Sequence, residues 1–156
     1  ITLFLNLSSY SFNLIEIRSI FYRAIESKKD NELLVNILDE YNDEINPLIK
    51  GYKGVAFMLM SKHSINPLQK LKLFTKGKDM LENSIKDNKW NVELRFLRHS
   101  IQSNVPAFLN YSSSLTEDKS IILNCGYGVG RSVLEVCKMF EKISKKSNKF
   151  ISQSSR

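Results

Sequence analysis

The chain has 156 residues, of which 42% are hydrophobic and 25% are charged. Such a balance is typical of a folded globular protein, and it excludes an intrinsically disordered chain and a bundle of membrane helices. The length allows one ordinary domain, or one domain with an appendage.

The formal net charge of +7 at pH 7 comes mostly from the C-terminal part of the chain. Residues 16–119 carry 16 basic and 14 acidic side chains, whereas residues 120–156 carry 7 basic and 2 acidic ones. The body is therefore close to balanced. The basic tail lacks the interleaved aromatic residues that stack on bases, so we expect a solvated tail and no specific nucleic-acid binding. A polyanion-binding arm is the alternative.

Residues 1–12 (ITLFLNLSSYSF) form an uncharged, largely apolar run that is too short to span a bilayer as a helix. A run of this kind before a helix-forming sequence is typical of the hydrophobic part of a signal peptide, here without its basic flank. We therefore expect a truncated signal peptide and an exported or periplasmic protein without a transmembrane span. The alternative is a buried or fraying N-terminal segment of a cytoplasmic protein.

Residues 13–119 are predicted to form a helical domain, because apolar residues recur at three- and four-residue spacing. The first helix is expected over 14–27. The basic pair 28–29 is expected to close it, which suits the negative end of a helix dipole. Asp30 is the predicted N-cap of a second helix over 31–43.

The central part of the body predicts two antiparallel helices joined by a short turn. Asn46 precedes Pro47, and Asn66 precedes Pro67, so each helix begins with an N-cap residue and a proline at its first position. The apolar residues expected to face the core are Leu48, Tyr52, Val55 and Leu59 in the first helix, and Leu68, Leu71, Phe74, Leu81 and Ile85 in the second.

A fifth helix is predicted over 89–103, with a buried stripe of Trp90, Leu94, Leu97 and Ile101. Asn104-Val105-Pro106 is expected to end it, because the residue before a proline disfavours the helical conformation.

Arg95, Arg98 and His99 on this helix are candidate anion-binding residues. The alternative interpretation is structural: buried charges that, with Glu93, tie down the loop that follows. No Ser or Cys nucleophile and no carboxylate pair accompanies His99, so no catalytic residue is predicted. No metal-ligand spacing is present, and no cofactor is expected.

A different pattern begins at residue 120. The β-branched run 120–124 (SIILN) predicts a short strand, the run 125–131 predicts a glycine-rich turn, and 133–145 predicts a helix. Residues 120–156 are therefore expected to form a strand–loop–helix appendage with a basic tail.

Two resemblances concern the helical body. The run 14–124, with IEIRSIFYRA, NPLQKLKLF and VELRFLRHSIQSNVPAFLNY, resembles a set of small bacterial helical proteins of unknown function. That resemblance implies export and supplies no binding residues. Small residues beside aromatics, as at Tyr52, Gly54 and Ala56, resemble the helical hairpins of tetratricopeptide repeats.

A third resemblance covers residues 121–146, which contain ILNCGYGVGRSVLEV and look like a C-terminal segment of UDP-glucose 4-epimerases. It implies that Gly128, Val129 and Gly130 lie near a uridine and make weak contact with a UDP-sugar. The chain departs from that family elsewhere, since it has neither the N-terminal GxxGxxG segment for NAD nor a Tyr-x-x-x-Lys pair. Catalysis by this chain alone is not expected.

The sequence thus predicts a mainly α protein of stacked antiparallel helical hairpins, solenoid-like, with a strand–loop–helix appendage at the C-terminus. The expected function is that of a non-enzymatic interaction or scaffold module with a protein partner. The alternative is a fragment of a UDP-glucose 4-epimerase that lacks the catalytic and NAD-binding parts.

Overall fold

The structure, a computed structural model, describes residues 14–41 and 46–126, and all regular structure within these ranges is helical. Its elements are α1 (Leu14–Ala24), α2 (Lys28–Asp39), α3 (Pro47–His63), α4 (Pro67–Asp87), α5 (Val92–Gln102), a 3-10 turn η1 (Ala107–Leu109) and α6 (Leu115–Gly126). The prediction of a mainly α protein is confirmed.

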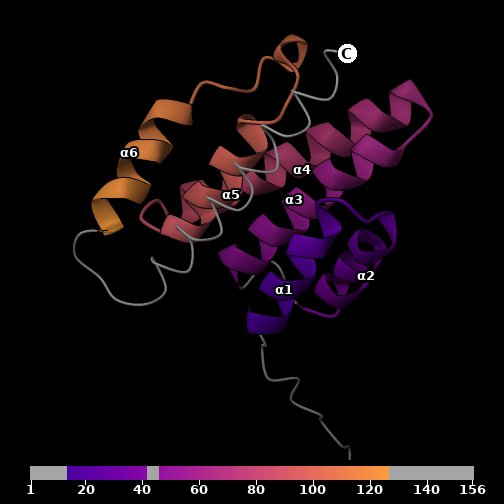
Figure 1. Cartoon of the computed structure of the whole chain (residues 1–156), viewed down its shortest axis with the longest axis horizontal. Helices are drawn as coiled ribbons and strands as arrows, with labels where there is room; N and C mark the ends of the chain where they lie inside the picture. The colour runs from indigo at the N-terminus through magenta and orange to yellow at the C-terminus, as the bar shows by residue number, and fades with distance from the viewer. Residues whose placement is uncertain (1–13, 42–45, 127–156) are drawn as a thin grey trace, which may run out of the picture.

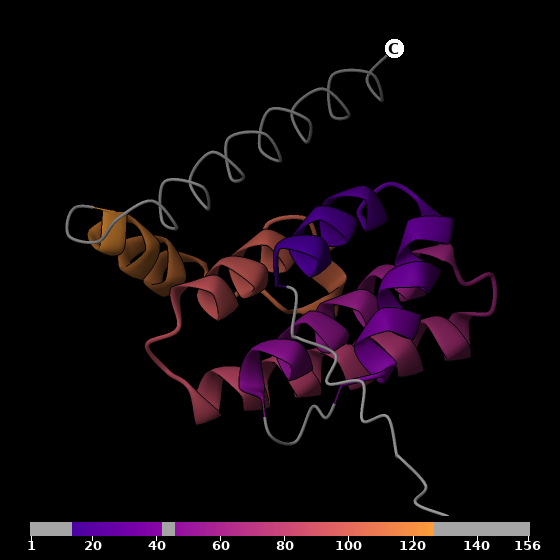
Figure 2. The same cartoon turned by 90° about the horizontal axis from the view of Figure 1, so that it is seen from below.

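The helices form three antiparallel hairpins, α1–α2, α3–α4 and α5–α6, that stack side by side (Figures 1 and 2). Helix α3 is central, since it contacts α1 and α2 of the first hairpin, its own partner α4, and α5 of the third hairpin. The predicted arrangement of helical hairpins is therefore confirmed.

Both helices of the central hairpin begin where the sequence predicts. The side-chain oxygen of Asn46 accepts hydrogen bonds from the backbone N–H groups of Leu48 (3.0 Å) and Ile49 (3.4 Å). The Asn66 oxygen accepts from the corresponding groups at the start of α4, at 2.9 and 3.3 Å. Each cap satisfies N–H groups that have no partner inside the helix.

Helices α3 and α4 approach most closely where two glycines face each other. A Cβ atom added to Gly54 would lie 2.6 Å from the carbonyl oxygen of Gly77 and 2.9 Å from the backbone nitrogen of Leu81. A Cβ atom on Gly77 would clash in turn with the Gly54 carbonyl oxygen and with Met58. The hairpin therefore depends on the absence of side chains at both positions.

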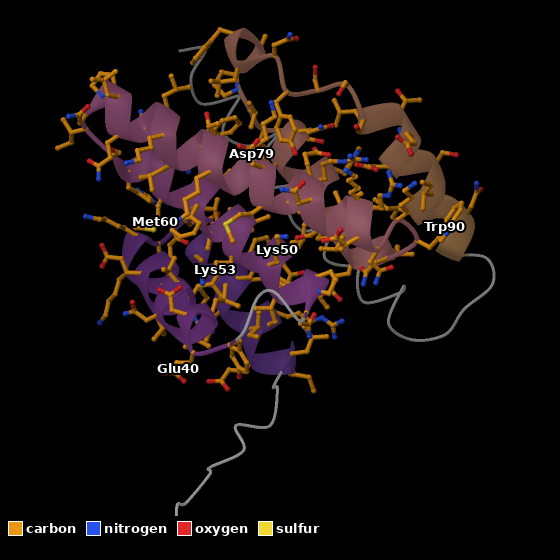
Figure 3. The ribbon with its side chains drawn as sticks, turned by 180° about the vertical axis from the view of Figure 1, so that it is seen from behind. Glu40, Lys50, Lys53, Met60, Asp79 and Trp90 are labelled. Atoms are coloured by element: carbon orange, nitrogen blue, oxygen red, sulfur yellow. The ribbon has the colours of Figure 1, made fainter. Side chains whose placement is uncertain are left out.

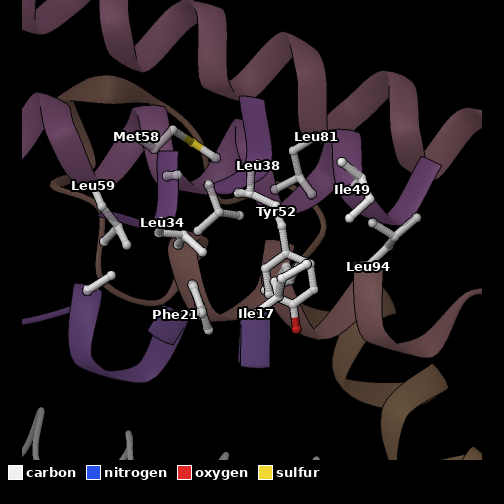
Figure 4. Packing of buried hydrophobic residues seen from close by; sticks show 14 of the residues in the cluster. Ile17, Phe21, Leu34, Leu38, Ile49, Tyr52, Met58, Leu59, Leu81 and Leu94 are labelled. Atoms are coloured by element: carbon white, nitrogen blue, oxygen red, sulfur yellow. The ribbon is translucent and has the colours of Figure 1, made fainter. Parts of the chain in front are cut away.

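The core lies where helices α1 to α5 meet, and Figure 4 shows Tyr52 among its buried aliphatic side chains. The rings of Tyr52 and Phe21 pack edge to face, with their centroids 5.5 Å apart. The buried amide of Asn31 donates a hydrogen bond to the carbonyl oxygen of Ala56 (3.2 Å), which joins α2 to α3. The largest fully buried apolar side chains are Ile17, Phe21, Leu34, Leu38, Ile49, Tyr52, Val55, Leu81, Leu94, Phe96 and Leu97.

Three residues that were predicted to be buried are exposed. Leu68 is 80% exposed, Leu71 is 54% exposed and Trp90 is 81% exposed. Leu81, which is buried, follows Leu68 by about 3.6 helical turns, so the two residues lie on nearly opposite sides of α4. Trp90 lies in the turn between α4 and α5, before the first residue of α5. Three- and four-residue spacing alone had assigned Leu68 and Leu71 to the buried stripe of α4, and Trp90 to that of α5.

The junction between α1 and α2 also differs from the prediction. Helix α1 ends at Ala24, and Lys28 and Lys29 begin α2 instead of closing α1. The N-cap is Ser27, whose hydroxyl oxygen accepts a hydrogen bond from the backbone N–H of Asp30 (3.2 Å). Asp30 therefore lies in the first helical turn, where its carboxylate accepts from Arg23 (3.1 Å) and suits the positive end of the helix dipole.

Replacing Ser27 with alanine is expected to lower the free energy of unfolding by about 1 kcal/mol, because the cap hydrogen bond is lost. Replacing Asp30 with asparagine should lower it less, since the ion pair of Asp30 is exposed. Urea unfolding of the two variants compares the two cap assignments directly. A larger loss for the Asp30 variant than for the Ser27 variant would restore the original assignment.

The short strand predicted at 120–124 is wrong, because these residues belong to α6. The buried Asp118 fixes the first turn of this helix, and Ile122, one turn further on, is buried on the same side. Once a first turn exists, each further residue adds a backbone hydrogen bond, and the lower helix propensity of β-branched residues is a small effect by comparison with tertiary contacts. The domain boundary predicted at residue 120 falls within α6. The predicted turn and helix over 125–145 lie mostly outside the described residues, as does the predicted signal peptide at 1–12.

Candidate functional site

Helix α5 carries Arg98, one of the predicted anion-binding residues, into a buried ion-pair network. The Arg98 guanidinium donates to both carboxylate oxygens of Asp118 on α6, at 2.7 Å each, and to Glu82 on α4 at 2.8 Å. Glu82 also accepts a hydrogen bond from the hydroxyl of Tyr111 (2.6 Å). Arg98 thereby joins the second and third hairpins, and Asp118 is fully buried.

Arg95 belongs to the same network. Its guanidinium donates to Glu117 (2.9 Å), to Asp118 (3.1 Å) and to the carbonyl oxygen of Lys89 (3.1 Å). The two arginines contribute two positive charges and the three carboxylates, including that of Glu82, contribute three negative ones. An added anion would therefore meet a network in which negative charges already outnumber positive ones, and the contacts fit the structural interpretation of these arginines.

Burial and hydrogen bonding to carboxylates have opposite effects on the pKa of Arg98, whereas both raise the pKa of Tyr111. Burial lowers the pKa of Arg98, but its hydrogen bond to Asp118 and the charges of Asp118 and Glu82 outweigh this effect and keep the pKa above its usual value. Burial raises the pKa of Tyr111, and the neighbouring Glu82 carboxylate raises it further. The arginine is therefore charged, and the tyrosine is a neutral hydrogen-bond donor, at every physiological pH.

Glu93 does not pair with these arginines, contrary to the expectation that it helps to tie down the following loop. Its carboxylate accepts two hydrogen bonds from Arg18 on α1, at 2.8 and 2.6 Å, and one from the Tyr52 hydroxyl on α3 at 2.5 Å. Burial raises the pKa of Tyr52 and the charge of Glu93 raises it further, so Tyr52 remains a neutral donor. Glu93 thus joins the third hairpin to the first two.

His99, the third predicted anion-binding residue, is buried beside α6. Burial lowers the pKa of His99, against the opposing effects of a hydrogen bond to the backbone at Leu115 and of the charge of Asp118. The folded protein therefore favours the uncharged imidazole. An uncharged imidazole does not attract an anion electrostatically.

This lowered pKa predicts a pH dependence of stability. Between about pH 7.5 and pH 5.5, His99 gains protons more readily in the unfolded chain than in the folded one, so the free energy of unfolding falls as the pH falls. The variant His99→Gln should lose less stability than the wild type over this interval. Urea unfolding at both pH values measures the difference, and an equal loss in the two proteins would contradict the assignment.

A second cluster of residues lies at the turn end of the α3–α4 hairpin. We define the tip surface as Ile65, Leu68 and Leu71 together with Lys62, Lys70 and Lys72. Ile65 in the turn is 98% exposed, and the three lysines are exposed. Figure 3 shows that Met60, near this end of α3, lies on the opposite side of the molecule from Trp90, which follows α4. The tip surface is therefore remote from the α4–α5 turn.

The charge of the tip surface is not neutralised by nearby acidic residues. The run 62–78 contains five lysines and no aspartate or glutamate. Lys76 lies over the ring of Phe57, with its ammonium 3.9 Å from the ring centroid. No described carboxylate forms an ion pair with Lys62, Lys70 or Lys72, whereas Lys28, Lys50 and Lys53 each have an acidic partner. Averaging charge over 16–119 concealed this local excess, which a shorter window along the sequence reveals.

A shallow groove lies beside the tip surface, between the start of α2 and the turn of the central hairpin. Glu32 and Lys28 both line this groove, and the carboxylate of Glu32 is 3.6 Å from the ammonium of Lys28. The groove is therefore electrically close to neutral next to a positively charged tip. Its lining includes Lys28, Glu32, Met60, His63, Gln69 and Leu73.

Metal sites, membrane spans and the predicted sugar-nucleotide contacts are not found in the part of the chain that the structure describes. No cluster of three or more His, Cys, Asp or Glu side chains there has an arrangement that suits a metal ion. None of the described helices has both the length and the apolar character needed to cross a membrane. Gly128, Val129 and Gly130, the predicted sugar-nucleotide contacts, lie outside the described residues.

Comparison with known proteins found no match to a protein family, to a curated protein or to a solved structure. The resemblances to the small bacterial helical proteins, to tetratricopeptide hairpins and to UDP-glucose 4-epimerase therefore stay predictions.

Proposed function

We propose that the protein is a non-enzymatic interaction module that docks on a partner through the tip surface. The observation that supports this most strongly is the exposure of Ile65, Leu68 and Leu71 together at the end of one hairpin. Single exposed apolar residues are common on protein surfaces, but a cluster rimmed by polar residues is typical of an interaction site.

The energetics favour docking. Removing one such aliphatic side chain from water contributes on the order of 1.5–3 kcal/mol when burial is complete. Three such side chains on one surface thus contribute several kcal/mol toward docking, which offsets part of the entropy lost on association. The buried networks of Arg98 and Glu93 support the same proposal, because they join all three hairpins into one body that presents the tip surface in a fixed position.

Site-specific photo-crosslinking in the source cells tests the proposal without assuming the class of partner. Leu68 is replaced by p-benzoylphenylalanine in one variant, and Phe108, which is 83% exposed in η1, is replaced in a second. Both positions are apolar and almost equally exposed, so the second is a matched control. Illumination is expected to yield a defined adduct at position 68 and none at position 108.

The chemical class of the adduct does not affect this test, because protein, lipid or nucleic acid at position 68 would each support a docking role. Absence of any adduct at position 68, or equal yields at both positions, would contradict it.

A further inference from the structure

We infer that the partner of the tip surface is an anionic lipid bilayer, with Leu68 and Leu71 entering the interfacial layer and the lysines contacting lipid phosphates. The inference rests on the proposed docking function and names its partner. It is carried by three features of the tip surface: its charge, its apolar residues and its composition.

Charge is the first feature. Lys62, Lys70 and Lys72 lie at the same end of the hairpin, at the last turn of α3 and the first turns of α4, without a described acidic partner. Lysines near an anionic bilayer each contribute to binding, and their contributions add within roughly a Debye length. The excess positive charge of the tip surface complements a negatively charged lipid surface.

The apolar residues are the second feature. Ile65 lies in the turn, and Leu68 and Leu71 follow on the first two turns of α4, so the three side chains form the extreme end of a hairpin. Aliphatic side chains on a protruding end can enter the boundary between headgroups and acyl chains without moving the rest of the fold. Lysine side chains beside them can extend to the phosphates while their methylene stems stay with the apolar residues.

Composition is the third feature, and it favours a bilayer over other anionic partners. Interfaces between proteins are enriched in aromatic residues and arginine and depleted in lysine, whereas the run 62–72 that contains the tip surface has three lysines and no arginine, phenylalanine, tyrosine or tryptophan. Binding of single-stranded nucleic acid relies on exposed aromatic rings. The exposed aromatics Trp90 and Phe108 lie outside the tip surface.

A fluorescence experiment on the full chain tests this inference. Trp90 is the single tryptophan and is exposed at the end of α4 remote from the tip, so it serves as an internal control. The variant Leu68→Trp with Trp90→Phe places the single tryptophan in the tip surface instead. Both proteins are mixed with phosphatidylcholine vesicles, with or without about 30% phosphatidylglycerol.

With anionic vesicles, the emission of the tryptophan at position 68 should shift to shorter wavelength and be quenched by brominated acyl chains, while Trp90 in the wild type should not respond. Pure phosphatidylcholine should give no shift at low vesicle concentration, and about 0.5 M salt should weaken the binding strongly. Because insertion is read at position 68, association through the basic C-terminal residues alone gives no signal.

Two charge variants provide matched controls. Lys62→Gln/Lys70→Gln/Lys72→Gln should weaken vesicle binding on the order of 100-fold. Lys86→Gln/Lys89→Gln/Lys119→Gln has the same change in net charge at exposed lysines outside the tip, and it should have a much smaller effect. Equal weakening by the two variants, or no response at position 68, would overturn the membrane inference.

The outcome of the photo-crosslinking separates this inference from the docking proposal. A protein or RNA adduct at position 68, without insertion into vesicles, would overturn the membrane partner and leave the docking function supported. Absence of both signals would overturn both.

Discussion

Replacing Asp118 with asparagine is expected to lower the free energy of unfolding by about 3 kcal/mol, because a buried ion pair that loses one partner leaves uncompensated charge. Asp118 is fully buried and receives hydrogen bonds from both Arg98 and Arg95. Asparagine has nearly the same shape but no charge, so the change isolates electrostatics from packing. Urea unfolding measures the loss.

Glu117 is the matched control, since it belongs to the same network and pairs with Arg95, but its side chain is 58% exposed. Glu117→Gln should cost less than about 1 kcal/mol, as exposed ion pairs usually do. If Asp118→Asn and Glu117→Gln reduced stability equally, the buried network would not be what holds α6 to α4 and α5.

The second large effect is expected at the crossing of α3 and α4. Gly77→Ala should lower the free energy of unfolding by about 2–3 kcal/mol, even though alanine favours helix more than glycine does. The added methyl group would overlap the carbonyl oxygen of Gly54 and the backbone of Met58, and backbone atoms cannot move aside without separating the helices. Thermal or urea unfolding is the measurement.

Gly51→Ala is the matched control within the same hairpin, because its closest neighbour is the end of the Leu94 side chain, which can change rotamer. We expect a loss of about 1 kcal/mol or less there. The double variant Gly54→Ala/Gly77→Ala should cost less than the sum of the single changes, since one separation of the helices relieves both overlaps. Additive losses would show that the glycines do not share one contact.

The parts of the fold that sequence reasoning predicted correctly depend on local signals. Asn46 with Pro47 and Asn66 with Pro67 define helix starts within a few residues, and the structure has both helices beginning there. At the start of α2, two competing local signals were present. Ser27 and Asp30 are both good N-cap residues, and Ser27 is the cap because the Asp30 N–H bonds to its hydroxyl.

The remaining features depend on contacts between residues that are distant in sequence. Arg95 and Arg98 on α5 both donate to Asp118 on α6, about twenty residues further along the chain. The spacing of these residues in the sequence does not indicate that α6 packs beside α5. The same contact fixes the start of α6 and explains why the β-branched residues Ile121 and Ile122 are helical. The five residues 120–124, from which a strand was predicted, do not by themselves indicate this tertiary contact.

The tip surface was missed for a related reason. Spacing alone assigned Leu68 and Leu71 to the buried face of α4 with Phe74, Leu81 and Ile85. A helical wheel centred on the three buried residues separates Leu68, which lies about 120° away, but not Leu71, which lies only about 60° away. The exposure of Leu71 therefore could not be predicted from spacing.

Hydroxyl-radical footprinting of the full chain, alone and with anionic vesicles, tests whether the tip surface is the part of the molecule that docks on a bilayer. We expect Ile65, Leu68 and Leu71 to be oxidised rapidly in the free chain and protected severalfold by the vesicles, whereas Phe108 and Trp90 should react at the same rate in both. Slow oxidation of Leu68 and Leu71 in the free chain would contradict the exposed tip surface. Rapid oxidation of these residues that vesicles leave unchanged, under conditions in which the protein is bound, would show that docking occurs elsewhere.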